Sequence, residues 1–135
     1  MRRVFADAFF YLALLSERDA AHGRATEIFH SGEITGTVTT VAVLLEVADG
    51  LSSPARRGVC AGFLDDLARE PKTTVRCVDD DLFQRGLDLY RTRSDKGWSL
   101  TDCISFVVMA DEGLTEALTG DHHFEQAGFA ALLAG

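Results

Sequence analysis

The sequence VFADAFFYLALL, residues 4–15, joins a short apolar segment to an apolar helix through one acidic residue. Residues 4–6 predict a buried strand, because three consecutive apolar residues end abruptly at a charge. Residues 8–15 predict a helix whose only polar group is the Tyr11 hydroxyl. Asp7 is therefore expected at a junction between a strand and a helix.

The same alternation of short apolar strands and helices continues along the chain. We expect further strands at residues 35–39, 73–78, 117–119 and 129–132. Helices are expected from an Asp19 cap to a Gly32 stop, at 41–49 behind a Thr40 cap, at 54–69, at 79–93, from the first turn at Asp102 to Gly113, and for one turn around His123. This order predicts an α/β fold with a central, mainly parallel sheet of four to five short strands covered on both faces.

Length and composition are those of one soluble domain. The 135 residues are 47% hydrophobic and contain no linker-like or repetitive tract, so we expect a single domain over residues 1–135. The longest uncharged stretch, residues 34–45, is shorter than the roughly 18 residues needed to span a bilayer. No export signal is recognisable, and we expect a cytoplasmic protein without a membrane segment. Its three cysteines, which form no CxxC pair, are expected to be reduced core thiols: Cys60, Cys77 and Cys103.

The charge distribution is acidic and uneven. The net charge of -8 argues against nucleic-acid binding by bulk electrostatics, so any RNA contact must be local. Residues 56–96 carry nine of the thirteen basic residues, whereas residues 97–135 contain six acids and no Lys or Arg. Cations should therefore gather around the last third of the chain.

Four separated acids are placed where a cation would explain them. Asp7 and Asp121 are the first charged groups after predicted strands, and ligands of parallel sheets bind beyond the carboxyl ends of strands. Glu46 and Asp102 interrupt apolar helices and have no basic residue within a helical turn, which leaves any buried charge uncompensated. An oxygen-rich set without Cys favours Mg²⁺ or Mn²⁺, and such ions support phosphodiester hydrolysis.

Each acid also has an ordinary structural interpretation. Asp7 and Asp121 fit helix caps, Glu46 fits a solvated stripe beside Asp49, and Asp102 fits the favourable first turn of a helix. The hypothesis of a metal site rests on the conjunction of all four.

Four sequence segments resemble the motifs of the PIN-domain family, most closely VapC-type toxins of bacterial toxin–antitoxin pairs. The third and fourth segments are the most specific, and together the four extend over nearly the whole chain. In one-letter code they are VFAD (4–7), TVAVLLEVA (40–48), WSLTDCISF (98–106) and LTGDHHFEQAGF (118–129).

The resemblance implies an α/β/α sandwich and an Mg²⁺-dependent, or Mn²⁺-dependent, endoribonuclease. It implies that Asp7, Glu46, Asp102 and Asp121 form the catalytic metal site, and that the Thr119 and Ser99 hydroxyls orient an acid or a water. It also implies homodimerisation and inhibition by a cognate antitoxin protein. One departure is Ala8, where the family often has Ser or Thr, and this puts the catalytic rate in doubt.

Two other functions remain open at this point. A catalytically weakened PIN-like protein-binding module would fit Ala8 and the acidic surface. An aspartyl-phosphate enzyme is disfavoured, because no second Asp follows Asp7 at the expected place and no late strand ends in Lys.

Several other residues have a functional and a structural interpretation. Adjacent His122 and His123 favour one surface and one packing residue over a shared transition-metal site. Trp98 favours core or dimer packing over base stacking. The apolar helix 8–15 exposes more than one face to a core or a partner. Six basic residues are candidates for phosphate contacts: Arg56, Arg57, Arg69, Arg91, Arg93 and Lys96.

Overall fold

Five parallel strands form one sheet in the computed structural model, which describes residues 2–135. The α/β class and the strand number predicted from the sequence are confirmed. The sheet order is β3-β2-β1-β4-β5, for strands β1 (Arg3–Ala6), β2 (Gly36–Thr40), β3 (Thr73–Arg76), β4 (Glu116–Leu118) and β5 (Ala130–Ala131).

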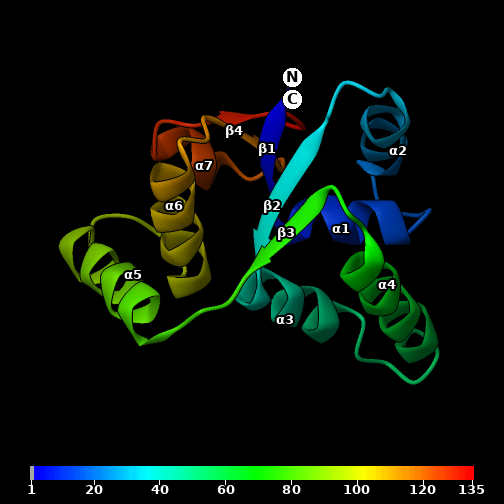
Figure 1. Cartoon of the computed structure of the whole chain (residues 1–135), viewed down its shortest axis with the longest axis horizontal. Helices are drawn as coiled ribbons and strands as arrows, with labels where there is room; N and C mark the ends of the chain where they lie inside the picture. The colour runs from blue at the N-terminus through cyan, green and yellow to red at the C-terminus, as the bar shows by residue number, and fades with distance from the viewer. Residues whose placement is uncertain (1) are drawn as a thin grey trace.

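Helices cover both faces of this sheet (Figure 1). Helices α1, α2 and α4 lie to one side, α5, α6 and α7 lie to the other, and α3 follows the carboxyl end of β2. The predicted sandwich is therefore present. The helices are α1 (Ala8–Leu15), α2 (His22–His30), α3 (Val41–Gly50), α4 (Arg57–Arg69), α5 (Asp80–Thr92), α6 (Leu100–Glu112) and α7 (His122–Gln126).

The strand order creates a crevice between β1 and β4. The chain first builds the sheet outward from β1 through β2 to β3, and then returns to place β4 on the other side of β1. At such a reversal the connections leaving the two neighbouring strands diverge, which opens a ligand site beyond their carboxyl ends. Asp7 follows β1, and Thr119 to Asp121 follow β4, so both connections carry polar groups into the crevice.

The central strand is apolar on both faces because helices cover both. Val4, Phe5 and Ala6 are fully buried. Phe5 packs against Phe124 of α7, with ring centroids 6.3 Å apart, and this contact ties the short C-terminal helix to the sheet. Burial of such side chains from water is the main force that holds the layers together.

Predicted caps begin and end several helices. The Thr40 hydroxyl accepts the N–H of Val43 at the start of α3, and the Asp79 carboxylate accepts the N–H of Leu82 at the start of α5. Gly113 ends α6 with φ at 68°, a left-handed conformation that glycine adopts without strain. These boundaries were predicted correctly.

Two predicted helix starts were wrong. The Asp19 carboxylate accepts the N–H of Ala21 inside a turn, so α2 begins only at His22. Pro54 lies in a turn closed by hydrogen bonds to the Ser53 carbonyl, and α4 begins three residues later. In both cases the residue that was expected to start the helix lies in a local turn instead.

The cysteine prediction holds for two of three residues. All three are free thiols, and Cys60 and Cys103 are buried. Cys77 is exposed, which corrects the prediction of a core thiol. The reason is that it follows β3, an edge strand whose own residues are only partly buried or exposed.

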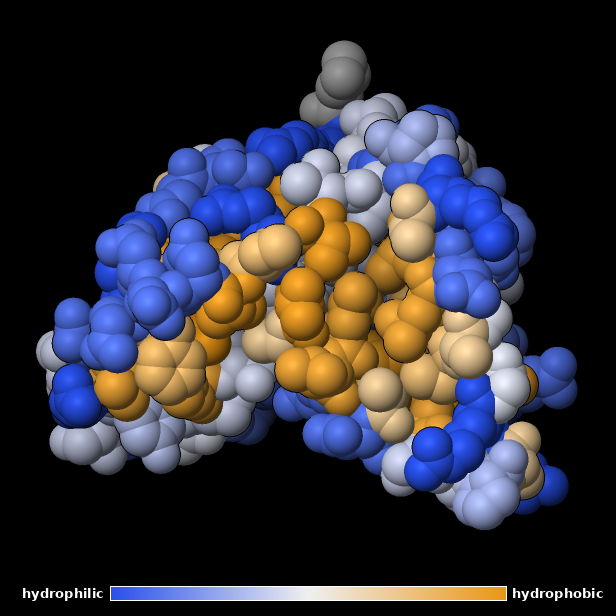
Figure 2. Space-filling model, turned by 60° about the horizontal axis from the view of Figure 1, so that its bottom comes forward, coloured by the Kyte–Doolittle hydropathy of each residue, from blue (hydrophilic) through white to orange (hydrophobic). Residues whose placement is uncertain are grey.

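An apolar surface lines the hollowed side of the molecule shown in Figure 2. None of the large exposed hydrophobic side chains in residues 2–135 comes from α1. On α3, α4 and α5 they are Val41, Leu45, Val59, Phe83 and Tyr90. The excess apolar surface expected on α1 therefore lies elsewhere. No helix among the described residues is long and apolar enough to cross a membrane.

Close packing of α5 on α6 depends on Gly86. A Cβ at this position would lie 2.6 Å from Cγ1 of Ile104 and 3.3 Å from its Cα. Gly86→Ala should therefore destabilise the protein by about 1–3 kcal/mol, although alanine favours helices. Gly62→Ala is the matched control, since Gly62 lies inside α4 with no atom within 4 Å, and it should stabilise by about 1 kcal/mol. Urea unfolding measures both; equal effects of the two variants would contradict this packing.

Candidate metal centre

Asp7 is a buried carboxylate at the carboxyl end of the central strand. Its residue is 5% exposed, and its side chain does not cap α1. Burial raises the pKa of Asp7 to about 7, with smaller contributions from the charges of Glu46 and Asp102. A group in this state strongly favours a nearby cation.

Thr119 connects the carboxyl ends of β1 and β4. Its fully buried hydroxyl donates to Oδ2 of Asp7 at 2.9 Å, and its oxygen accepts the N–H of Asp121 at 3.1 Å. The first of these bonds opposes the rise in the pKa of Asp7. The hydroxyl therefore fixes one acid and the backbone of another, and the prediction that Thr119 orients an acid is consistent with this geometry.

Asp102 lies in the first turn of α6 and is held by a capping box. Ser99 Oγ accepts the N–H of Asp102 at 3.0 Å, and Asp102 Oδ2 accepts the N–H of Ser99 at 3.1 Å. The residue is 7% exposed. Asp102 is thus both the first-turn acid of the structural interpretation and a buried carboxylate facing the crevice, and Ser99 orients it.

Glu46 lies at the rim of the crevice. Its residue is exposed, which corrects the expectation of a buried acid in an apolar helix. Partial burial of its carboxyl group raises the pKa of Glu46, and so do the charges of Asp102, Asp121 and Asp49. These mutual effects link Glu46 to two acids from other segments, so α3 contributes to the same site.

Asp121 caps α7 beside the other acids. Its Oδ1 accepts the N–H of His123 at 2.9 Å. The preceding Gly120 lies directly against Phe9, because a Cβ there would approach the ring to 2.5 Å. Only glycine allows this approach, and the approach sets the path of the backbone that presents Asp121.

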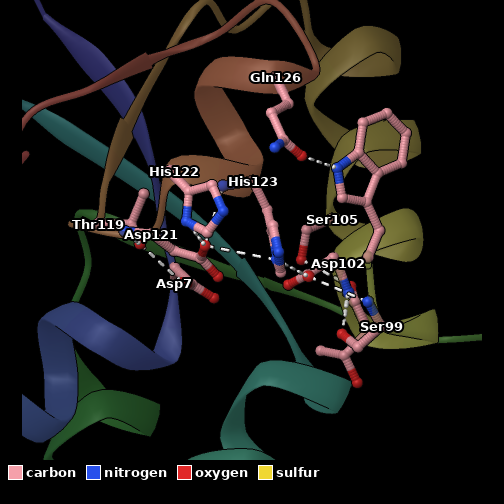
Figure 3. A network of polar contacts seen from close by, with 11 residues as sticks. Asp7, Ser99, Asp102, Ser105, Thr119, Asp121, His122, His123 and Gln126 are labelled. Atoms are coloured by element: carbon pink, nitrogen blue, oxygen red, sulfur yellow. Dashed lines mark hydrogen bonds and ion pairs between the residues drawn. The ribbon is translucent and has the colours of Figure 1, made fainter. Parts of the chain in front are cut away.

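The sequence interpretation missed the role of His123. Its Nδ1 lies 3.1 Å from Oδ2 of Asp102 and 3.4 Å from Oδ1 of Asp121, so one ring nitrogen stands between two carboxylates (Figure 3). His122 is exposed, as expected, but its Nδ1 is also 3.7 Å from Asp121. The ligand atoms of Asp121, His122 and His123 lie within 4.8 Å of one another, so the two histidines converge beside Asp121. The exposure of His122 and the partial burial of His123 agree with the prediction of one surface and one packing residue. The only available signal was the spacing D-H-H at a helix start, where the first turn brings them together.

The charges of the crevice fit a hard divalent ion. Figure 3 shows Asp7, Asp102 and Asp121 directed into one region from β1, α6 and the segment after β4. Within residues 2–135, no Lys or Arg forms an ion pair with any of these acids or with Glu46. Carboxylate oxygens dominate the set of possible ligands, as Mg²⁺ and Mn²⁺ prefer, and the nearest side-chain nitrogen is Nδ1 of His123, 3.1 Å from Asp102.

Comparisons with known proteins agree with this fold. The PIN domain family model matches residues 4–130, and the chain belongs to that family. Within the family, the likeness is to a VapC-type toxin. The crystal structure of VapC20 from Mycobacterium tuberculosis, described as a toxin that cleaves the sarcin–ricin loop, is 25% identical with a TM-score of 0.85. The alignment covers 93% of this chain and 95% of VapC20. The search of curated proteins found no match.

Because the pKa of Asp7 is raised, replacing its carboxylate with a neutral group should stabilise the fold, by an amount that depends on pH. Below the unfolded value of 3.8, Asp7 is neutral in both states, and stability is then lost as pH rises towards the folded value of about 7. Without metal at pH 8, Asp7→Asn should therefore be more stable than wild type by up to about 4 kcal/mol, and the difference should vanish near pH 3.5.

Urea unfolding in EDTA at the two pH values measures this difference. Asp66→Asn, which removes an exposed acid of α4, is the control and should change stability little at either pH. If Asp7→Asn were less stable than wild type at pH 8, the charge of Asp7 would not destabilise the metal-free fold.

Proposed function

We propose that this chain is a divalent-metal-dependent endoribonuclease and the toxin of a toxin–antitoxin pair. Asp7, Glu46, Asp102 and Asp121 hold Mg²⁺ or Mn²⁺ and are the catalytic acids. The observation that carries the proposal is the convergence of these acids on the crevice between β1 and β4 without a Lys or Arg partner among residues 2–135. The family membership and the likeness to an RNA-cleaving toxin support RNA as the substrate.

A bound divalent ion supplies a polarised phosphoryl oxygen and a water of lowered pKa. The protein supplies orientation. Thr119 keeps one oxygen of Asp7 in a hydrogen bond, so the rest of that carboxylate is directed into the crevice. Ser99 holds Asp102 in the same way, because its backbone N–H donates to the carboxylate. Ala8 is buried and leaves no hydroxyl beside Asp7, so Thr119 is the side-chain hydroxyl that orients this acid.

The remaining proposals concern partners and location. We propose that residues 1–135 form a single PIN domain that acts in the cytoplasm, forms a homodimer, and is inhibited by a cognate antitoxin protein. The exposed apolar side chains of α3 and α5 support a protein interface, since a contiguous apolar surface of this kind is costly in water. We assign the second subunit to this face and test it at Leu45, because Leu45 is the most exposed of these residues at 62%.

Nuclease activity should disappear with either of two buried acids. Purified wild type with Mg²⁺ or Mn²⁺ should cut RNA, including a sarcin–ricin loop oligonucleotide, and EDTA should stop it. Asp7→Asn and Asp102→Asn should each lower the rate by about a hundredfold or more, since loss of metal-derived stabilisation costs several kcal/mol. Asparagine keeps the shape of each side chain, so the Thr119 and Ser99 contacts survive.

The control for this assay is Asp66→Asn, which should cut at the wild-type rate. Equal cleavage by the two site variants and wild type would contradict the metal-site assignment. Absence of cleavage of any RNA by wild type, together with tight metal-independent partner binding, would instead support the catalytically weakened binding module.

Association through α3 should depend on Leu45. Leu45→Lys places a charge in the proposed interface and should convert the dimer to a monomer, which multi-angle light scattering measures. Phe29→Lys is the matched control, because Phe29 is equally exposed at 61% but lies on α2. A monomeric wild type, or a dimer that survives Leu45→Lys, would argue against this interface.

A further inference from the structure

A cavity of about 430 Å³ lies between the end of α5 and the start of α6. Its size falls within the range of small-ligand sites. The lining includes three cationic side chains and no acid: it consists of Tyr90, Arg91, Arg93, Ser94, Lys96, Gly97 and Trp98. In a chain of net charge -8, this is a local concentration of positive charge.

The cavity contains a preorganised planar cation. The Arg93 guanidinium carbon lies 5.1 Å from the centroid of the Trp98 ring. That ring is 6% exposed, its Nε1–H donates to Oε1 of Gln126 at 2.9 Å, and it packs edge-on against Phe106. Trp98 is therefore a core residue that supports Arg93, and Arg93 presents its other side to the cavity.

Exposed acids already contact these cations. The Arg93 guanidinium donates to both oxygens of Asp95, at 3.1 and 3.3 Å, and Lys96 lies 3.9 Å from the same carboxylate. Arg91 pairs with Asp88 at 3.7 Å. Residues 88–98 thus hold three basic residues against two acids, a net charge of +1. Exposed ion pairs typically contribute about 1 kcal/mol or less, and a phosphate group can accept the same bidentate contact from Arg93 that Asp95 accepts, so phosphate can replace the carboxylates.

The cavity and the metal centre share a wall. Ser99, which follows Trp98 directly, caps α6 and holds Asp102. A Cβ on Gly97 would lie 3.7 Å from Nε2 of His123, whose other nitrogen lies between Asp102 and Asp121. The cavity therefore lies beside the metal centre, within reach of a strand whose phosphate lies at the acids.

We propose that the cavity is a subsite for single-stranded RNA next to the scissile phosphate. A base stacks on Tyr90, whose ring is exposed, and backbone phosphates contact Arg93 and Lys96. The inference rests on the proposed ribonuclease function. This subsite provides local phosphate contacts in a protein whose net negative charge disfavours RNA binding.

The test is RNA binding without catalysis. Fluorescence anisotropy in EDTA follows a short fluorescein-labelled single-stranded RNA of mixed sequence. Arg93→Ala/Lys96→Ala should weaken binding at least about tenfold and reduce the slope of log affinity against log salt by about 1.4, or 0.7 for each lost phosphate contact. Tyr90→Ala should weaken binding by about fivefold or more and leave the slope unchanged.

Two further variants make the test specific. Arg18→Ala/Lys72→Ala removes the same charge from exposed positions outside the cavity and should bind like wild type. Asp95→Asn removes the competing carboxylate and should tighten binding by up to about fivefold. A misfolded protein cannot produce this gain.

The outcomes separate this inference from the proposed function. Cleavage of RNA by wild type in Mg²⁺, together with equal binding by all variants, would overturn the subsite alone. A loss in the Arg18 and Lys72 variant as large as that in the Arg93 and Lys96 variant would also overturn it. Lost binding in the cavity variants would support the subsite even where wild type failed to cut.

Discussion

The rest of the site depends on a carboxylate that is buried at the end of the central strand. Asp7 is removed from water, and the charges of Glu46 and Asp102 act on it from neighbouring elements. Such a placement destabilises the metal-free fold unless a cation compensates it. The donors around the acids, the Thr119 hydroxyl and the Ser99 backbone, orient the carboxylates without neutralising them. The site therefore retains a strong demand for positive charge.

The topology of the sheet explains why acids far apart in the sequence lie in one site. Asp7 and Asp121 belong to connections that leave β1 and β4, where the sheet order reverses. Asp102 lies in the first turn of α6, a helix alongside the sheet, and Glu46 lies on α3, which follows β2. The two strands beside β1 lead into the segments that carry Glu46 and Asp121, so the central strand holds three of the four acids at one end of the sheet.

Much of this arrangement was predictable because it depends on local patterns. Apolar runs ending at Asp7 and before Asp121 identified two strand ends, and the Thr40 cap and the acidic residues from Asp79 marked two helix starts. The sequence left Glu46 with two interpretations, a buried acid and a solvated residue beside Asp49, and could not decide between them, because the side of α3 that faces the core is determined by packing. The contact of His123 with two acids was not predicted for a similar reason. Its position between two acids depends on how α7 is held by Phe124 against Phe5.

The charge distribution fits two tasks that oppose each other. Under the proposed function, the acids of the crevice attract a cation, and the same crevice accepts a polyanion. Basic side chains on the loop between α5 and α6 stand beside the acids, separated from them by Gly97 and the Ser99 cap, so the two charges do not cancel. Net charge alone describes neither function.

The most direct test of the central claim is to locate the ion itself. Anomalous diffraction from crystals grown with Mn²⁺ should show a peak in the crevice between β1 and β4, within coordination distance of carboxylate oxygens from Asp7 and Asp102. Absence of a peak there, in crystals of protein that cleaves RNA in the same Mn²⁺ solution, would contradict the account.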